Sequence, residues 1–496
     1  MVRSRVTHLD GVVHLRFPRS MLVPLAIAQF VASYACTNMN VAVTSVAKDL
    51  GTTVTGVQTA ITLCTLVPAA LTIPGSKLTD IWGRRNCFRI GLVLYAAGAL
   101  IAASASGLGM LLLGFAVLQG VGCALLIPPI YILVTVSSSD VATRARGFGV
   151  LSAAAGGGAA AGPLIGGIVT TTISWRGSFI LQFLLIASTL ALSRRISDPG
   201  VRGPRPPFDY LGAILSAAGL FFVVLGVLQA GTYGWLTARQ NFTVAGVVVL
   251  PRGSLSPVWL LVGVGLLFLL SFVLHAGAWE RRGREPLVPL RLFRNRGSNL
   301  GLVTQNIQWL VLQGSFFVIS VYLGTAHHYS AVMTGLILTP AAVGILASSA
   351  VSRRLARRRS ERFLVRRGFA LTLLGMILLR VLYDASSGVV TFVPGLLVMG
   401  VGIGMMLTAS VNVVQSSFPS GEQGDISGLS RSASDLGSSL GTAVVGSILV
   451  ASTASGRGPY ADALIAIAAI ALIGMAAAAL LPPDPPRAAE GVGGPS

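Results

Sequence analysis

The chain contains about fourteen windows of roughly 20 predominantly apolar residues, separated by short polar segments. A window of this length can cross a bilayer as a helix, because a helix satisfies its backbone hydrogen bonds internally. Only 10% of the 496 residues are charged, against about 25% in a globular protein. We therefore expect an all-α polytopic membrane protein with no soluble domain left over. The windows lie near 21–46, 55–75, 87–106, 108–136, 148–173, 177–193, 209–230, 257–278, 299–324, 331–351, 364–383, 389–416, 427–451 and 461–481.

The positive charges predict the orientation of these spans. An even number of spans places both termini on one side, and most of the 36 Lys and Arg residues fall in loops on that side. They include Arg3, Arg5, Arg16, Arg19, Lys77, Arg84, Arg85, Arg89, Arg281, Arg282, Arg284 and the cluster from Arg353 to Arg367. The other side has few, among them Lys48, Arg176, Arg239, Arg252 and Arg457. The positive-inside rule then predicts cytoplasmic termini in the cytoplasmic membrane.

The net charge of +20 is explained by this topology and by contact with the lipid bilayer. Nucleic-acid binding is not expected, because no aromatic stacking residues accompany the basic loops. The sequence also has no paired carboxylates, no Ser-His-Asp arrangement, no Cys-His metal set and no phosphate-binding loop. We therefore expect a monomer that is not an enzyme and that uses no cofactor and no metal.

One apolar stretch carries small residues at regular intervals. Gly158, Gly162 and Gly166 are four apart and so stack on one helix face, where a neighbouring helix can approach closely. Pro163 removes a backbone donor beside them, which a span tolerates when its neighbours satisfy the freed groups. The stretch is either a tight packing seam or a moving part. Its small residues and proline are Gly149, Gly158, Gly162, Pro163, Gly166 and Gly167.

A second informative stretch is the loop that follows the second window, from Ser76 to Arg85. Asp80 lies at the predicted end of a helix, where it could accept from Arg84 or Arg85 or face the positive end of another helix. Such a contact would latch two halves of the protein in one orientation. The alternative is an ordinary charged turn. The candidate latch residues are Ser76, Asp80, Gly83, Arg84 and Arg85.

Together the loop and the glycine stretch resemble the major facilitator superfamily, specifically its drug:proton antiporter branch with fourteen spans. The loop departs from the family pattern at Ser76, where glycine is usual. Trp175-Arg176 and the pair Gly437 and Gly441 extend the resemblance. It implies two six-helix pseudo-repeats at 21–193 and 297–481, two inserted helices at 209–278, a cytoplasmic segment at 1–20 and a disordered cytoplasmic tail at 482–496.

The resemblance also locates a departure in the expected coupling site. The branch usually carries an Asp in the first span and an Arg in the fourth, and here Ala35 and Ala116 occupy those positions. Asp435 is the one acid placed well inside a predicted span, which makes it a candidate for proton coupling. Arg431 is one helical turn earlier and could instead hold Asp435 in a fixed structural ion pair. The sequence leaves both interpretations open.

For a small-molecule substrate, the resemblance points to polar and aromatic side chains of the first, fourth, ninth and twelfth spans. These are Tyr34, Asn38, Asn40, Gln119, Gln305, Gln308, Trp309, Gln313, Asn412 and Gln415. Amides dominate, which favours a neutral or weakly amphiphilic substrate.

Three hypotheses for the function follow from the sequence. The first is a drug or natural-product exporter that works by alternating access and is driven by protons. The second is a facilitator or carrier of another small solute without proton coupling. The third is a membrane protein that does not transport a solute, such as a sensor or a protein that flips lipid.

Overall fold

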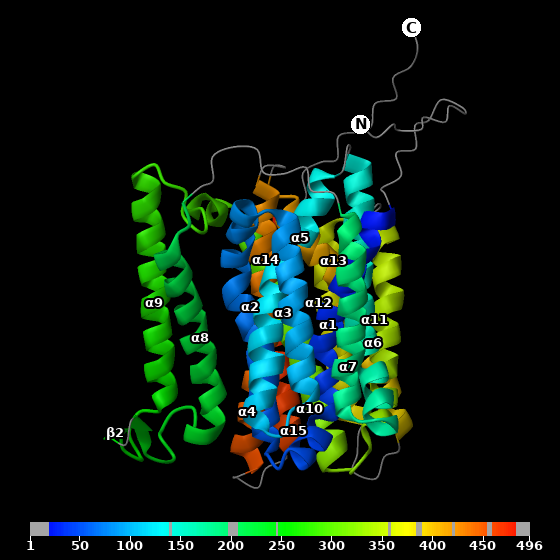
Figure 1. Ribbon diagram of the computed structural model, residues 1–496. Coiled ribbons are helices and arrows are strands. Elements are labelled where there is room, and N and C mark those ends of the chain that lie inside the picture. The colour runs from blue at the N-terminus through cyan, green and yellow to red at the C-terminus, as the bar shows by residue number, and fades with distance from the viewer. Residues whose placement is uncertain are drawn as a thin grey trace, which may run out of the picture.

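The computed structural model describes residues 19–137, 141–196, 207–244, 247–355, 359–382, 389–418, 422–453 and 459–482. Within these ranges the chain is almost entirely helical, and its long helices run side by side along one axis (Figure 1). The expected all-α architecture is confirmed. Of the predicted terminal segments, 1–20 and 482–496, all but residues 19, 20 and 482 lie outside the described residues.

Six crossings precede residue 193 and form the N-terminal half. Five of them are single helices: α1 (Arg19–Asp49), α2 (Val54–Trp82), α3 (Arg84–Ala103), α6 (Val141–Thr172) and α7 (Trp175–Leu192). The fourth crossing consists of α4 (Leu108–Leu111), the π-helix η1 (Leu112–Leu118) and α5 (Gln119–Val136) in succession. The short η2 (Ser193–Arg195) follows α7. In η1, Gly114 packs against Gly98 of α3, and a Cβ at Gly114 would lie 2.7 Å from the Gly98 carbonyl oxygen. Small residues thus bring neighbouring backbones together where lipid supplies no hydrophobic drive for helix association.

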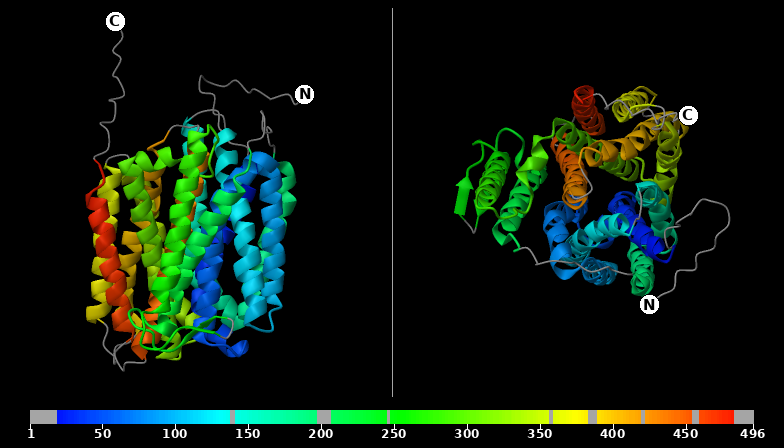
Figure 2. Two further views of the ribbon diagram at one scale, coloured as in Figure 1. Left: turned by 90° about the vertical axis from the view of Figure 1, so that its left-hand side faces the viewer. Right: turned by 90° about the horizontal axis from the view of Figure 1, so that it is seen from above.

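The two inserted helices form a pair at the side of the bundle. They are α8 (Tyr210–Tyr233) and α9 (Pro257–Arg281), and between them lies an antiparallel hairpin of β1 (Phe242–Val244) and β2 (Val247–Leu250), which the sequence analysis did not predict. Seen from above, the pair lies outside the ring formed by the other crossings (Figure 2). The α8 helix contacts α2 and α14. The α9 helix exposes Leu266, Leu267 and Leu274, as expected of a helix that faces lipid.

A buried carboxylate anchors this inserted pair. Asp209 caps α8, because its Oδ1 accepts a hydrogen bond from the Gly212 backbone N–H at 2.8 Å. The same Oδ1 lies 2.8 Å from Nε2 of His275 on α9, and Oδ2 accepts from the Leu287 backbone N–H at 3.3 Å. One side chain therefore joins both inserted helices to the segment that leads into the C-terminal half.

The C-terminal half follows the short η3 (Leu290–Arg294). It consists of α10 (Arg296–Thr325), α11 (Ala331–Leu355), α12 (Glu361–Leu382), η4 (Val389–Thr391), α13 (Phe392–Gln415), α14 (Gln423–Thr453) and α15 (Pro459–Ala479). In the described part of the chain, 13 helices are long and apolar enough to cross a membrane. The α12 helix, at the predicted span 364–383, is as long as the others but more charged. Arg362 and Arg366 on α12 donate to the Ala479 carbonyl oxygen at 2.8 and 3.2 Å and so cap the end of α15.

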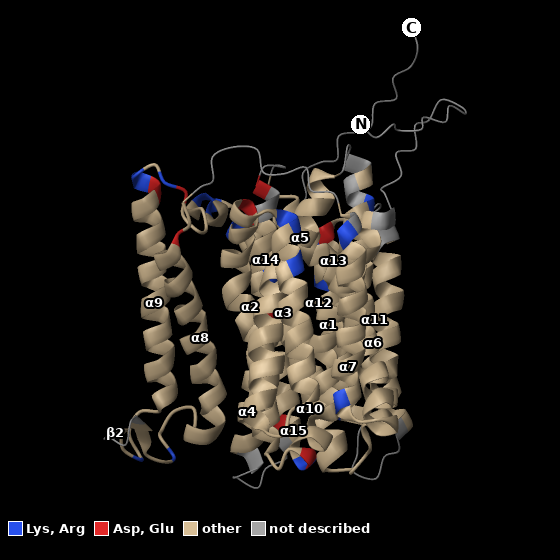
Figure 3. Cartoon of the chain, viewed as in Figure 1, with Lys and Arg blue, Asp and Glu red and all other residues tan. Residues whose placement is uncertain are grey.

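Most charged residues in the described part of the chain lie toward the two ends of the bundle, and few lie in its middle (Figure 3). We call the end where α1 begins and α15 ends the terminal face, and the other end the opposite face. The opposite face of the N-terminal half is held by an ion pair between Asp49 and Arg176. Arg176 also donates to the Ala105 carbonyl oxygen at 2.8 Å, and the Trp175 indole N–H donates to Asp49 at 3.0 Å. The Trp175-Arg176 motif thus ties α7 to the end of α1 and to the turn after α3.

Candidate substrate and coupling site

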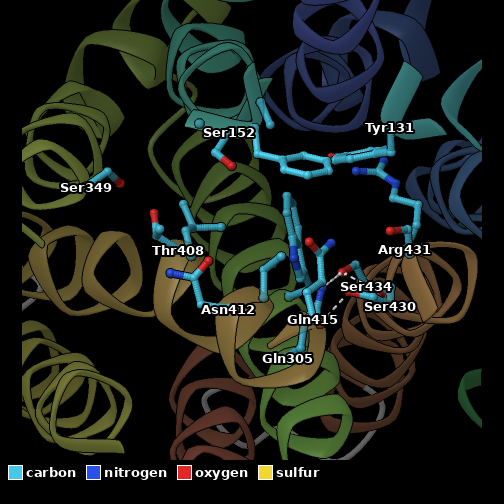
Figure 4. A pocket seen from close by; sticks show the side chains of 17 residues that line it. Tyr131, Ser152, Gln305, Ser349, Thr408, Asn412, Gln415, Ser430, Arg431 and Ser434 are labelled. Carbon is cyan, nitrogen blue, oxygen red and sulfur yellow. Dashed lines mark hydrogen bonds between the residues drawn. The ribbon is translucent and has the colours of Figure 1, made fainter. Parts of the chain in front are cut away.

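A cavity lies between the two halves, in the part of the bundle next to the terminal face (Figure 4). The space between its walls that is not filled by atoms is about 820 Å³ when the solvent at its open mouth is included. The N-terminal half contributes α5 and α6, and the C-terminal half contributes α10, α11, α13 and α14. The lining residues are Tyr131, Phe148, Ser152, Ala155, Gly156, Gln305, Trp309, Ser349, Leu407, Thr408, Val411, Asn412, Gln415, Ser427, Ser430, Arg431 and Ser434.

Helical spacing explains why these side chains share one cavity. Gln305 and Trp309 on α10 are four residues apart, as are Thr408 and Asn412 on α13, so each pair points from one helix face. On α14, Ser427, Ser430, Arg431 and Ser434 repeat at intervals of three and four. A single stripe of each helix therefore supplies most of the wall.

Hydrogen bonds fix part of this wall in place. Ser430 donates to the Gln305 side-chain oxygen at 2.9 Å, and the Gln305 amide donates to the Ser434 hydroxyl at 2.7 Å. Ser349 on α11 donates to the Gly404 carbonyl oxygen at 3.1 Å. These polar groups satisfy one another, and the cavity surface they form is ordered before any solute enters.

One ion pair borders the cavity. The Arg431 guanidinium lies 2.9 Å from Oδ1 of Asp435, and its Nε donates to Oδ2 at 3.1 Å, so the contact is bidentate. The two side chains are only 10% and 5% exposed. Arg431 belongs to the lining, whereas Asp435 lies behind it, about 18 Å along the 31-residue α14. The predicted pair therefore forms at mid-depth in the bundle.

Three other helices present ionisable groups to this pair. These groups are the thiols of Cys36 of α1, Cys64 of α2 and Cys123 of α5 and the phenol of Tyr131 of α5, whose titration the Asp435 carboxylate would influence. No second carboxylate or lysine is among them. Ala35 and Ala116, at the positions where the branch usually carries charges, are buried at 3% and 0% exposure. In this part of the described chain, Asp435 is accordingly the carboxylate placed between the halves.

The predicted substrate residues separate into two groups. Gln305, Trp309, Asn412 and Gln415 line the cavity. The remaining six are buried outside its lining: Tyr34, Asn38, Asn40, Gln119, Gln308 and Gln313.

Hydrogen bonds hold several of this second group in the interior. The Gln313 amide donates to the Cys36 carbonyl oxygen at 2.8 Å and to Asn40 at 3.4 Å, which joins α10 to α1 across the two halves. Gln119 donates to Gln182 at 3.3 Å inside the N-terminal half. Gln313 and Asn40 lie outside the cavity because α1 and α10 are in contact there.

The sequence analysis missed the aromatic and hydroxyl side chains of α5, α6 and α14 in the cavity wall. Tyr131 and Phe148 lie on consecutive helices and stack with ring centroids 6.0 Å apart. A usable signal was the run of serines at 427, 430 and 434, whose spacing places them on the helix face of Arg431. No pattern marked Phe148 or Ser152, which lie among other apolar and small residues.

The glycine stretch of α6 contacts both halves. Cβ atoms added at Gly158, Gly162 and Gly166 would lie 2.0 to 2.9 Å from atoms of α1, so this face packs closely within the N-terminal half. A Cβ at Gly167 would instead lie 2.4 Å from the Ala331 carbonyl oxygen of α11, in the other half. At Gly149, near the terminal face, an added Cβ meets nothing within 4 Å.

A companion contact reinforces the link to α11. A Cβ at Gly335 would lie 2.4 Å from the Pro163 carbonyl oxygen, and the Val332 backbone N–H donates to Thr171 at 3.0 Å. The two halves are therefore closed against each other near the opposite face, along α6 and α11.

At the terminal face, an ion pair joins the two halves. Lys77 of α2 lies 3.0 Å from Asp425 of α14. Asp80 is half-buried, and among the described residues it has no ion pair within 4 Å. Lys77, Arg84, Asp425 and Glu285 are the charges that act on it electrostatically. Lys77, which was not among the candidate latch residues, makes the contact that the structure contains.

Two helical halves around a polar cavity, closed at one face and lined from both sides, define a membrane transporter. The Major Facilitator Superfamily family description matches residues 25–442, so the chain belongs to that superfamily.

Named relatives and solved structures agree with this assignment. The chain is similar to the puromycin resistance protein pur8 of Streptomyces alboniger, with 28% identity over 88% of this chain and 82% of that protein. It is similar to the cephamycin export protein CmcT of Amycolatopsis lactamdurans, with 29% identity over 95% and 93% of the two chains. The fold resembles that of a peptide transporter, POT, in complex with sulfate (TM-score 0.63, 17% identity, 94% and 95% coverage).

Proposed function

We propose that this protein exports a drug or small natural product across the cytoplasmic membrane by alternating access, in exchange for protons. The observation that carries the proposal is the Arg431–Asp435 ion pair, because it borders the cavity between the halves at mid-depth. The names of the relatives as resistance and export proteins support the direction and the kind of solute.

The positive-inside rule supports an orientation with the terminal face in the cytoplasm. In that orientation the cavity is reached from the cytoplasm, and the contacts of α6 with α11 close the outer side. The conformation is then the one that loads a solute for export. Release outward requires the two halves to separate along α6 and α11 and to approach each other around the cavity.

In this proposal α6 is a moving part. Its Gly158, Gly162 and Gly166 face keeps the helix attached to α1 of its own half, while Gly167 lies on the contact that must open. The loop with Ser76, Asp80, Gly83, Arg84 and Arg85 acts at the terminal face. There Lys77 and Asp425 link the halves in the loading conformation.

Asp435 is the proposed coupling group. As a carboxylate it holds Arg431 by two charge-assisted hydrogen bonds, and as an acid it loses most of that attraction. Protonation therefore releases an arginine that belongs to the cavity wall, which gives the proton a direct means of changing the site. No other carboxylate among the described residues lies between the halves at this depth.

Transport assays on Asp435 variants test the proposal. Cells of an efflux-deficient host would express the wild type, Asp435→Asn or Asp435→Glu, and efflux of puromycin, ethidium and an uncharged hydroxyanthraquinone would be followed with and without a proton uncoupler, the comparison being made on the probe that the wild type exports. We expect the uncoupler to stop wild-type efflux. Asp435→Asn should abolish uphill efflux yet keep downhill exchange, because its side chain cannot carry the proton. Asp435→Glu keeps a titratable group and should retain partial activity.

Two outcomes would contradict parts of this proposal. Wild-type efflux that continues unchanged in the uncoupler would favour the facilitator hypothesis over exchange for protons. Normal uphill efflux by Asp435→Asn would return the ion pair to a purely structural role.

A further inference from the structure

The cavity has an aromatic wall. Tyr131 of α5 and Phe148 of α6 are nearly parallel, with 23° between the ring planes and 6.0 Å between centroids. Trp309 of α10 lines the cavity from the other half. Gly156, one turn beyond Ser152 on α6, adds no bulk, and a Cβ there would meet nothing within 4 Å. Flat aromatic faces with open space beside them suit a flat ring system, because offset stacking of such rings is favourable.

Two hydroxyl groups in the wall are not engaged. Ser152 of α6 and Thr408 of α13 form no hydrogen bond in the part of the chain that the structure describes, and both are half-buried. Figure 4 shows them pointing into the space between the halves from its two sides. They differ in this from Ser349, which lines the same cavity but donates to Gly404. A solute that carries a carbonyl or hydroxyl group can satisfy both of these groups and so contact both halves at once.

The charge of the wall favours a particular class of solute. Arg431 is the only charged side chain among the lining residues, and Asp435 neutralises it through a bidentate contact. The nearby carboxylate of Glu361 accepts a hydrogen bond from the Asn412 amide at 3.1 Å. This amide does not neutralise Glu361, but Glu361 is outside the lining, so a cation that enters the cavity would lose water without meeting a carboxylate in the wall itself.

We infer that the transported solute is a flat aromatic molecule without net positive charge, whose carbonyl or hydroxyl groups bond to Ser152 and Thr408 while its rings pack on Tyr131, Phe148 and Trp309. The inference rests on the proposed function, which it narrows to one class of solute. Ser152 and Thr408 are its specificity-determining residues.

Equilibrium dialysis with the purified full-length protein in lipid nanodiscs tests the inference without requiring transport. The probes are an uncharged hydroxyanthraquinone and ethidium, which is flat and aromatic but cationic. We expect the anthraquinone to bind at least about tenfold more tightly. Ser152→Ala and Thr408→Val should each weaken its binding by roughly three- to tenfold, as loss of one hydrogen bond predicts. Ser348→Ala is the matched control, because Ser348 lies on α11 outside the lining and its hydroxyl donates to the Ile345 carbonyl oxygen; it should change binding less than twofold.

The result that would overturn the inference is ethidium binding as tight as that of the anthraquinone, or an equal loss of affinity in all three variants. Proteoliposomes with an imposed proton gradient separate this inference from the proposed function. Export of ethidium without binding of the anthraquinone would refute the solute class and leave the exporter standing. Binding of the anthraquinone with the expected variant effects but no transport of either probe would support the site and refute the proposed function.

Discussion

Gly167→Ala should shift the protein away from the conformation described here. Gly167 lies on the contact between the halves near the opposite face, where an added Cβ would be 2.4 Å from the Ala331 carbonyl oxygen and 3.1 Å from its carbonyl carbon. Both are backbone atoms of α11 and cannot rotate away as a side chain can. Overpacking of this kind costs about 1–3 kcal/mol, so the equilibrium between closed and open opposite faces should shift roughly 5- to 150-fold.

The assay measures access to the cavity from the terminal face. Ser349→Cys places a thiol in the cavity wall, and inverted membrane vesicles expose the cytoplasmic side to an impermeant maleimide. Vesicles that carry the protein without Ser349→Cys give the background labelling of the four native cysteines, of which three are buried and one is half-buried. For two conformations that start near equal population, this shift lowers the share open to the terminal face from one half to about 1/6–1/150, so we expect Gly167→Ala to slow labelling of the introduced thiol roughly 3- to 75-fold.

Two other glycines of α6 provide the controls. Gly149→Ala should leave labelling unchanged, because its Cβ would meet nothing within 4 Å. Gly158→Ala should lower the stability of the N-terminal half rather than shift the conformation, because its Cβ would lie 2.3 Å from the Phe30 carbonyl oxygen in the same half. Wild-type labelling of well-expressed Gly167→Ala would refute the reasoning, as would an equal slowing by Gly149→Ala.

Two further predictions concern charged residues at the ends of the bundle. Asp80→Asn should impair efflux, as expected of a latch residue. Membrane content and thermal stability should stay near those of the wild type, because Asp80 has no ion pair within 4 Å among the described residues. Full activity in the efflux assay would contradict the latch role. Arg176→Ala should lower the unfolding temperature in detergent, because it loses the contacts with Asp49 and the Ala105 carbonyl oxygen. The side chain is partly exposed, so the expected loss of stability is about 1 kcal/mol. An unchanged unfolding temperature would show that these contacts do not stabilise the protein.

The fold could be predicted from the sequence because each crossing must satisfy its backbone within one apolar stretch of sufficient length. That constraint located all the long helices, including α12, whose arginines lie near its ends where they can reach the bundle surface. The hairpin between α8 and α9 was missed because it is a short run of β-branched residues outside the membrane-length windows. The rule that identifies the spans does not apply there.

The candidate site was predicted less completely, for a different reason. The Arg431–Asp435 ion pair could be predicted from helical spacing, because residues four apart on one helix are neighbours whatever the rest of the fold. Hydropathy does not determine how far each helix rotates about its axis, and so it could not show that Phe148 and Ser152 face the cavity. Nor could it separate Gln305 from Gln313, which lie on the same face of α10 two turns apart. Which of them faces the cavity depends on where the two halves separate.

The face of α10 that carries Gln305 and Gln313 also gives a reason for the conformations with a closed and an open opposite face to be close in free energy. Toward the closed opposite face, the contact between α1 and α10 buries two polar atoms without hydrogen-bond partners in the described protein, Nδ2 of Asn40 and Oε1 of Gln313. Each such atom costs about 1–3 kcal/mol when buried. In the proposed cycle, opening the opposite face would hydrate them and offset the packing that is lost along α6 and α11. The amides that were predicted to line a cavity would then do so in the outward-open conformation, where they would meet the solute after Gln305 and Trp309.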